Sequence, residues 1–412
     1  FVRLLGVMAL REAQLAAVAQ VVGTSERAAQ YSDIFEQLLC ETQDNDTALI
    51  ESVDTFVRHA VLDRVNTTGA GLLVGRHVLA DMRAKLLRAH QTPSHTLASS
   101  CMFVQALQCI LIPCESSATL WDDELVAFRL LLAKQHEALS QWKDAAQVLQ
   151  SITPDAARRA PDTSWAQLSV WIARLWLQVP CLSQAEHALR RANTAIHAER
   201  ENEVLVQELW ICQARVFAAQ HRYYDAAARY MDLWYASSSA DVSAVQLASL
   251  YALFAPPSIQ RTHMLTQILR DPCSSTWPFV QVLRKASEGR FLGACDVKAV
   301  SPYVDDHLQT DGLHVWAEHN ICAAARVFSR VSLPVLAELV GLGNDVDACE
   351  SAVARLIVHG KLPTECRIDQ VTYAVYLGDE PKNAAWNSRI STSLNELDAA
   401  HALLTVSSAG LP

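Results

Sequence analysis

The sequence predicts an all-α protein: a right-handed solenoid of TPR-like helical repeats, then a winged-helix domain and a C-terminal helix. Three observations support this fold class. Glycine (13) and proline (14) together supply only 27 of the 412 residues, too few for a fold built on tight turns. A helical pattern recurs about every 40 residues in the middle of the chain. Near the end, two short helical patterns precede β-prone runs, which is the order of a winged helix.

Residues 1–120 are helical in composition and are interrupted by short polar breaks, so we expect irregular helical repeats there. The longest apolar run, residues 101–114, is shorter than the roughly 20 residues that a bilayer-spanning helix needs. It also contains Gln105 and Gln108. We therefore expect a buried helix at this place. The first 22 residues carry three charged side chains and do not predict a signal peptide.

Residues 121–300 contain the regular repeats. Three helices begin with a large residue at Trp142, Leu182 and Tyr223, continue with small alanines, and return to a large residue seven positions later. Alanines let a neighbouring helix approach closely. The helix expected before each of them is apolar on several faces, as it is when a helix packs against two neighbours; these preceding helices cover residues 128–139, 171–179 and 204–218. The pattern favours stacked helical pairs, and a helical bundle built from the same residues is the alternative.

The polar stretch of residues 301–312 predicts a linker loop. The pattern then changes, and we expect the winged-helix domain over residues 313–380, starting with a helix at 313–328. Ser332 can cap a short helix whose first turn tolerates Pro334, and the glycines after residue 340 end it.

The next helix is expected to begin near Asn344 or Asp345 and to end at Gly360. Two β-prone runs, residues 366–369 and 371–377, complete the winged helix. Residues 381–412 form the last domain, a helix expected from about residue 383 to 404. Its apolar side chains recur every three or four residues as Trp386, Ile390, Leu394 and Leu397.

The charge balance argues against nucleic acid and membranes as partners. The net charge is −10, whereas attraction to phosphate backbones or anionic lipid needs an excess of Lys and Arg. A winged helix can enter the major groove of DNA, but residues 332–380 hold eight acidic and three basic side chains. A winged-helix nucleic-acid binder therefore stays as an alternative that the charge disfavours.

No local motif predicts an enzyme or a cofactor. The fourteen histidines form no His-Glu-x-x-His pattern, and the eleven cysteines form no Cys-x-x-Cys pair that would hold zinc. The cysteines lie mostly in apolar runs, which predicts reduced, buried thiols of a cytosolic or nuclear protein; together with the family likeness described below, the expected location is cytoplasm and nucleus. A thiol or metal hydrolase whose residues meet only in the folded chain stays as the third hypothesis.

Several segments resemble the PCI proteins, the scaffold subunits of the proteasome lid, the COP-nine signalosome and a translation initiation complex. The likeness runs from about residue 124 to 387. Its motifs are residues 142–149 (WKDAAQVL), 172–177 (IARLWL), 184–186 (QAE) with Arg191 and Ala192, 318–320 (EHN), and 360–362 (GKL) leading to 368–370 (IDQ). The first and last of these are most similar to a signalosome subunit, with the proteasome lid as the runner-up. Tyr373 stands where the family usually has glycine.

The resemblance implies a non-catalytic scaffold subunit of a complex that removes the ubiquitin-like modifier Nedd from cullins. A different, metal-dependent subunit performs catalysis in that complex. The implied partners are other PCI subunits, metalloprotease-like (MPN) subunits and cullin-RING ligases, and no cofactor is implied.

The resemblance implies roles for the β-edge and the linker, and the position and chemistry of the closing helix and of the polar triplet predict roles for their residues. Val371, Tyr373 and Val375 would form a β-edge that pairs with a neighbouring subunit. Trp386, Ile390, Leu394 and Leu397 would enter a bundle with partner helices, or fold back on the winged helix. Tyr303, Asp305 and Asp306 lie in a linker similar in place to a loop that meets a metalloprotease-like partner. Glu318, His319 and Asn320 would hydrogen-bond the junction between repeats and winged helix, a functional triplet being the alternative.

Overall fold

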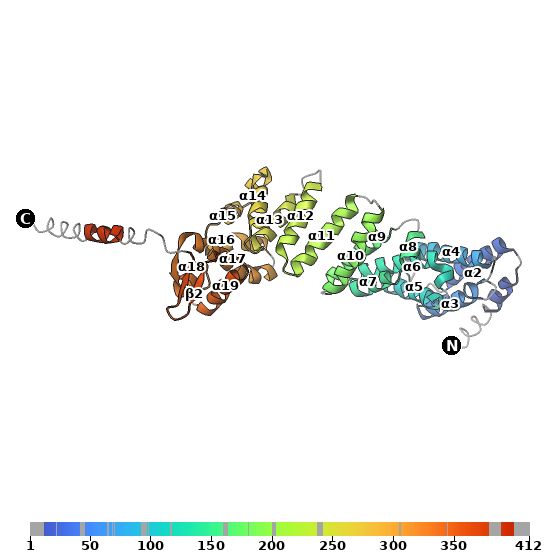
Figure 1. Ribbon diagram of the computed structural model, residues 1–412. Helices are drawn as coiled ribbons and strands as arrows, with labels where there is room; N and C mark the ends of the chain where they lie inside the picture. The colour runs from blue at the N-terminus through green and yellow to red at the C-terminus, as the bar shows by residue number, and fades with distance from the viewer. Residues whose placement is uncertain are drawn as a thin grey trace, which may run out of the picture. The chain divides into compact units, whose positions relative to one another are not determined.

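The computed structural model describes residues 12–21, 23–41, 46–63, 66–67, 69, 71–91, 97, 99–115, 118–159, 164–179, 181–199, 203–236, 242–304, 306–343, 345–378 and 389–398. Almost all of them are helical, and the described strands belong to one small sheet near the C-terminal end (Figure 1). The chain divides into two compact units, Phe1–Val216 and Phe217–Pro412. The boundary falls inside helix α11 (Glu203–Ala219). The expected all-α class with a small winged-helix sheet is confirmed.

The first unit is an all-helical array with two hydrophobic cores. One core joins α2 to α6 and includes the fully buried rings of Tyr31, Phe56 and Trp121. The other begins on α6 and continues to α11. The described helices of this unit include α2 (Thr24–Glu41), α3 (Asp46–Ala60), α4 (Gly71–Gln91), α5 (Ser100–Glu115), α6 (Ala118–Ala138), α7 (Trp142–Gln150), α8 (Pro154–Arg159), α9 (Trp165–Gln178) and α10 (Leu182–Glu199). The apolar run at 101–114 is the buried helix α5, as predicted. None of the described helices is both long enough and apolar enough to cross a membrane.

The repeating helices begin where the pattern places them. Helix α7 starts at Trp142, α10 at Leu182, and α12 (Tyr223–Ala236) at Tyr223. The alanines of the pattern have no exposed surface, and they are Ala145, Ala146, Ala185, Ala188, Ala226 and Ala227. Successive helices are neighbours, as in the contacts of α6 with α7, α7 with α9 and α9 with α10. The pairwise packing is that of stacked repeats.

Two of the tight turns inside helical pairs use a left-handed residue that is not glycine. Ser140 follows α6 with a φ of 60°, and His221 follows α11 with a φ of 59°. In both turns the next amide returns to the preceding helix: Gln141 N–H donates to the carbonyl of His136, and Arg222 N–H donates to the carbonyl of Phe217. These bonds satisfy helix-end carbonyls that would otherwise lack a donor. The repeat therefore makes sharp reversals without glycine.

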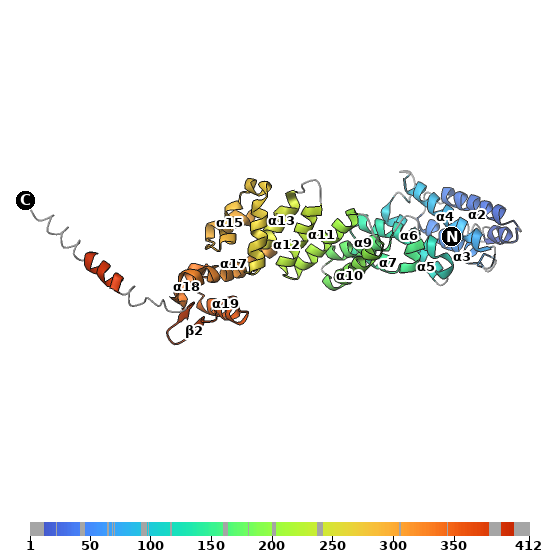
Figure 2. The same ribbon diagram turned by 45° about the horizontal axis from the view of Figure 1, so that its top comes forward.

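The second unit starts with α12 and ends in the winged helix. Its elements before the sheet are α12, α13 (Val242–Phe254), α14 (Ile259–Arg270), η2 (Pro272–Thr276), α15 (Val280–Glu288), α16 (Ala294–Val300), η3 (Ser301–Tyr303) and α17 (Asp306–Val327). Helix α17 packs against α13 and also against both helices of the winged helix (Figure 2). It therefore connects the repeats of this unit to the winged helix.

The prediction of a linker loop at residues 301–312 is wrong for most of these residues. Residues 301–303 form the 3-10 helix η3, and residues 306–312 are already the first turns of α17. Gly312 suggested a break, but it lies in α17 against Phe254, and an added Cβ would lie 2.4 Å from Phe254 Cε1. The glycine serves close helix packing. A glycine in a polar sequence can either interrupt a helix or allow close packing within one, and the sequence alone does not show which.

The winged helix consists of β1 (Arg330–Ser332), α18 (Leu333–Val340), α19 (Val346–Val358), β2 (Arg367–Asp369) and β3 (Ala374–Tyr376). Most helix boundaries follow the predicted signals, but the side chain of Ser332 makes no capping hydrogen bond to α18. Pro334 lies in the first turn of α18, Gly341 ends it with a φ of 91°, and the Asp345 carboxylate caps α19 by accepting from the Ala348 N–H. Strand β1 was not expected. Its register pairs Arg330 with Tyr376 and Val331 with Val375.

The order of the sheet is β1-β3-β2, with both pairs antiparallel. The prediction that Val375 lies on a β-edge is therefore wrong: β3 is the middle strand and Val375 is fully buried. Val371 and Tyr373 lie in the turn before β3, and their side chains are 90% and 59% exposed. The edges of the sheet are β1 and β2.

Of the closing helix, the structure describes residues 389–398, which are helical (Figure 1). Ile390, Leu394 and Leu397 are all more than half exposed. Trp386 lies outside the described residues. Within the described part of the chain, this apolar stripe is uncovered.

Candidate functional site

Glu318, His319 and Asn320 are three consecutive residues of α17, and each joins that helix to a different neighbour. The three side chains point to different sides because helical residues are separated by about 100°. His319 and Asn320 are buried, with 4% and 2% exposed, whereas Glu318 is half-buried. Buried polar side chains are stable only when they are hydrogen-bonded. Their partners therefore show what this part of the protein is built to hold.

Asn320 binds the backbone on both sides of the junction. Its Oδ1 accepts from the Leu292 N–H at 2.9 Å, and its Nδ2 donates to the Leu292 carbonyl at 2.9 Å and to the Val340 carbonyl at 3.3 Å. Leu292 precedes α16, and Val340 is the last residue of α18. One amide side chain thus fixes α17, the segment before α16 and the end of α18.

His319 lies between Arg261 on α14 and the backbone of Arg290. Its Nδ1 is 3.3 Å from an Arg261 terminal nitrogen, and its Nε2 is 2.9 Å from the Arg290 carbonyl oxygen. Because a guanidinium only donates and a carbonyl only accepts, the neutral ring carries its proton on Nε2. Burial, followed by the charge of Arg261, lowers the pKa of His319 to about 4. His319 is therefore neutral at physiological pH and serves as a structural bridge.

Arg261 is 2% exposed, and helix α13 compensates its charge. Its Nε donates to the Ala252 carbonyl and a terminal nitrogen donates to the Leu253 carbonyl, both at 2.9 Å. These carbonyls end α13, where the helix dipole is negative. Burial lowers the pKa of Arg261 to about 10, so the guanidinium stays charged at neutral pH. Together with His319 it connects α13, α14 and α17.

Glu318 faces the winged helix. Its carboxylate lies 3.7 Å from an Arg355 terminal nitrogen on α19 and 3.9 Å from Lys361 Nζ. These are long, partly exposed ion pairs, which contribute little to stability individually. They orient α19 and the turn that follows it toward α17.

The described residues offer no catalytic constellation. No three His, Cys, Asp or Glu side chains among them come together as metal ligands do. Burial raises the pKa of the Cys114 thiol to about 12 and those of Cys212 and Cys349 to about 11, which leaves these thiols protonated and unreactive. The expectation of buried thiols is confirmed for Cys114, Cys212, Cys349 and Cys366 and is wrong for Cys40, Cys101 and Cys295, which are exposed; the other four are partly buried.

Two family models match the chain, one in the helical repeats and one in the region of α17 and the winged helix. The model described as "PSMD12/CSN4, N-terminal" matches residues 123–241, which are the regular helical pairs. The model described as "PCI domain" matches residues 306–379, from the first residue of α17 to the end of the sheet.

Curated relatives match over most of the chain. COP9 signalosome complex subunit 4 of Caenorhabditis elegans is 26% identical over 84% of this chain and 85% of its own length. The protein of the same name from Drosophila melanogaster is 23% identical over 92% of this chain and 91% of its own length. That of Arabidopsis thaliana is 23% identical over 84% and 88% respectively.

This chain contains a PCI domain. The PCI match begins at Asp306, so α17 is part of the PCI domain and the boundary predicted at residue 313 falls inside that helix. The triplet on α17 accordingly lies within the PCI domain and connects it to α14 and to the segment before α16.

The residues predicted to contact partners lie in separate elements of the structure. Tyr303 is 40% exposed in η3, with its ring 5.4 Å from that of Phe279. Asp305 lies outside the described residues, and Asp306 begins α17. Val371 and Tyr373 share a turn organised by Asp369, whose carboxylate accepts from the amides of Val371 and Thr372. The Thr372 hydroxyl also donates to this carboxylate at 2.6 Å, and this bond, followed by the amide of Thr372, lowers the pKa of Asp369.

The residues that hold the triplet could not be predicted from the sequence. Arg261 is 58 positions from His319, and Leu292 is 28 positions from Asn320. No local pattern connects such distant positions. The only sequence signal was the polar triplet itself within an apolar helix, which indicates buried hydrogen bonds without naming their partners.

Proposed function

We propose that this chain is subunit 4 of a COP9 signalosome, a non-catalytic scaffold in the complex that removes Nedd from cullins. The observation that carries the proposal is the match to relatives of that name along most of both chains. The fold agrees with a scaffold: stacked helical pairs, a winged helix, and an apolar helix stripe that is uncovered in the described chain. We place it in the cytoplasm and nucleus, where cullins are modified.

The sheet of the PCI domain supplies one docking surface. Within the described sheet, β1 and β2 each have an unpaired side, because β3 is between them. Unpaired N–H and C=O groups on an edge strand recruit a further strand. We propose that a neighbouring PCI subunit pairs with one of these edges, and that Val371 and Tyr373, in the turn beside β2, contact that neighbour through their exposed side chains.

The helix over residues 389–398 supplies a second surface. Ile390, Leu394 and Leu397 recur at helical spacing and are exposed. We propose that they, with Trp386, enter a helical bundle with the C-terminal helices of partner subunits. Replacing Leu394 and Leu397 with Ser would remove assembly while leaving the rest of the chain folded, because neither side chain contributes to a described core. The matched control is Ser393→Ala on the same helix.

We propose that the segment around Tyr303, Asp305 and Asp306 contacts a metalloprotease-like (MPN) partner and helps couple substrate arrival to its activation. Deleting the segment would remove the first turn of α17, so substitution is the sharper test. Tyr303→Ala with Asp305→Ala should lower cullin deneddylation by the reconstituted complex without changing its composition. Unchanged deneddylation would remove this role.

Affinity purification from native extract, followed by mass spectrometry, tests the assignment as a whole. Recovery of signalosome subunits and cullins supports it. Recovery of proteasome lid and base subunits would move the chain to the proteasome-lid family, which the "PSMD12/CSN4" match also allows. A winged-helix nucleic-acid binder is less favoured, because Asp345, Asp347 and Glu350 lie at the start of α19, the helix that would enter the groove.

A further inference from the structure

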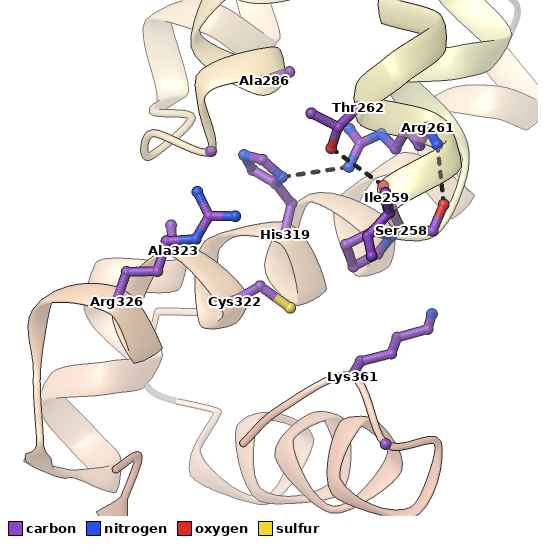
Figure 3. Close-up of a pocket in the computed structure, with 13 residues that line it drawn as sticks. Ser258, Ile259, Arg261, Thr262, Ala286, His319, Cys322, Ala323, Arg326 and Lys361 are labelled. Atoms are coloured by element: carbon purple, nitrogen blue, oxygen red, sulfur yellow. Dashed lines mark hydrogen bonds between the residues drawn. The ribbon is translucent and has the colours of Figure 1, made fainter. Parts of the chain in front are cut away.

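A cleft of about 380 Å³ lies within the second unit beside the buried triplet (Figure 3). Its walls come from the start of α14, the end of α15, the middle of α17 and the turn after α19. Three cationic side chains line it: Arg261 from α14, Arg326 from α17 and Lys361 from the turn. No Asp or Glu is among its described lining residues. In a chain with a net charge of −10, such a local excess of positive charge needs an explanation.

Arg261 forms the buried end of this charge. Three of its five guanidinium N–H groups have an acceptor in the described chain, namely the Ala252 carbonyl, the Leu253 carbonyl and Nδ1 of His319. The remaining two belong to the terminal nitrogens. His319 is held neutral and adds no charge of its own at physiological pH. The most buried cation of the cleft is thus Arg261, which is held in place by hydrogen bonds and has little contact with water.

Arg326 and Lys361 provide the outer cations. Arg326 donates to the Glu288 carbonyl at 3.3 Å and lies directly against Gly289, where an added Cβ would be 2.1 Å from a terminal nitrogen. Lys361 Nζ lies 3.9 Å from Glu318, beyond hydrogen-bond distance. Lys361 therefore has donors without a described acceptor at hydrogen-bond distance. Both side chains have donors available for a ligand.

The N-terminus of α14 adds to the same field. Ser258, which caps this helix by accepting from the Arg261 N–H, and Ile259 both line the cleft. The N-terminal end of a 12-residue helix carries partial positive charge and favours anions. It reinforces the three side-chain cations, which come from separate elements.

We propose that this cleft binds a compact, soluble phosphate-bearing anion at the junction of the helical repeats and the winged helix. Arginine and lysine together are the side chains that recognise phosphate, and a group with several negative charges matches three cations that line one cleft better than one carboxylate does. The volume lies at the lower end of the range for small-molecule sites. A ligand there would touch α14, α17 and the turn after α19 at once, and would stabilise their arrangement because it binds only the folded chain.

Calorimetric titration of the purified full chain with tripolyphosphate, at constant ionic strength, tests the proposal. We expect one site per chain. Arg326→Gln with Lys361→Gln should weaken binding at least tenfold, because both outer cations are lost. Arg355→Gln is the matched control: this cation also lies beside Glu318 but does not line the cleft, and it should bind like the parent chain.

Alkylation of Cys322 gives a second measurement. This thiol lines the cleft, and tripolyphosphate should slow its labelling by iodoacetamide, as read by mass spectrometry. The exposed Cys40 and Cys295 are internal controls whose labelling should not change. Thermal unfolding of each variant without ligand establishes that it folds.

Three outcomes would overturn the proposal: absence of binding by the parent chain, equal weakening by the double variant and by Arg355→Gln, or tighter binding of a glutamate-rich peptide than of tripolyphosphate. The last outcome would make the cleft a site for an acidic segment of a protein. None of these results depends on assembly, so they are independent of the proposed scaffold function.

Discussion

The side-chain amide of Asn320 and the backbone of Leu292 form a reciprocal pair, one hydrogen bond in each direction and both 2.9 Å long. Two strands in a sheet pair in the same way, but here a single side chain replaces one strand. Both residues are buried, so water cannot replace either bond. Stability of the junction should depend strongly on this one residue.

Replacing Asn320 with Ala should lower the free energy of unfolding of the second unit by about 3 kcal/mol, because a buried N–H and a buried carbonyl lose their partner. Urea denaturation followed by circular dichroism measures this effect. The control is Gln281→Ala, an exposed amide on α15, which should change stability by less than about 0.5 kcal/mol. Equal effects of the two substitutions would show that the pair adds no net stability.

Acidification should destabilise the protein through His319. Its pKa is about 4 in the folded chain, against an ordinary value of 6.5 in the unfolded chain. Between these values the unfolded chain binds a proton and the folded chain does not, so stability falls as the pH drops below about 6.5. Arg261, 3.3 Å from Nδ1, and the nearby Arg326 both oppose protonation.

Thermal or urea unfolding at pH 7 and pH 5 tests this dependence. The parent chain should lose about 2 kcal/mol more than His319→Gln over that interval, because glutamine does not titrate. Other titrating groups contribute equally to both proteins and cancel in the difference. A parallel loss in the two proteins would show that His319 becomes protonated without cost.

Replacing Tyr373 with Gly should stabilise the winged helix. Tyr373 has a φ of 47°, a left-handed conformation that is unfavourable for a tyrosine and free for glycine. Its carbonyl accepts from the Leu333 N–H at 2.7 Å, at the start of α18, so this conformation is part of the junction between turn and helix. The net gain should be about 0.5 to 1 kcal/mol, since glycine also loses more entropy on folding.

Chemical denaturation measures the gain, and Val371→Gly is its control. Val371 is exposed in the same turn and is absent from the positive-φ residues of the chain, so glycine there should not stabilise. Destabilisation by Tyr373→Gly would mean that the tyrosine ring contributes more than the backbone strain costs.

Gly312→Ala should destabilise α17 by about 1 to 2 kcal/mol, although alanine favours helix formation, because its Cβ would collide with Phe254. The Phe254 ring cannot move freely, since it stacks on Trp316 with ring centres 6.1 Å apart. Thermal unfolding reports the effect. Gly378→Ala is the control, because nothing lies within 4 Å of its added Cβ.

A double substitution distinguishes collision from other causes. Adding Phe254→Leu should recover part of the stability that Gly312→Ala loses, although the leucine alone is destabilising. Strictly additive effects would show that the two positions do not interact.

Local chemistry explains why many boundaries could be predicted. The helices that start at Trp142 and Tyr223 each follow a polar turn. Asp345 starts α19 through its side chain, which caps the helix, and Gly341 ends α18 through its left-handed backbone conformation. These signals involve residues a few positions apart. Such short-range preferences operate whatever the rest of the fold does.

The wrong predictions, a break at Gly312 and a β-edge at Val375, concern positions that are determined by residues far away in the sequence. Gly312 suggested a break because the ring of Phe254, 58 positions earlier, is invisible in the sequence. Val375 was assigned to an edge because β1 has only three residues directly before α18, too few to show the alternation of a strand. The partners of His319 and Asn320 are likewise set by tertiary packing.

Helix α17 runs without interruption through its 22 residues, a length of about 33 Å. One end packs against α13 and the other against α18 and α19. A continuous helix resists bending, so it acts as a rod: a force applied near Asp306 turns the winged helix along with it. We therefore expect a partner that displaces one end of α17 to displace the other end as well.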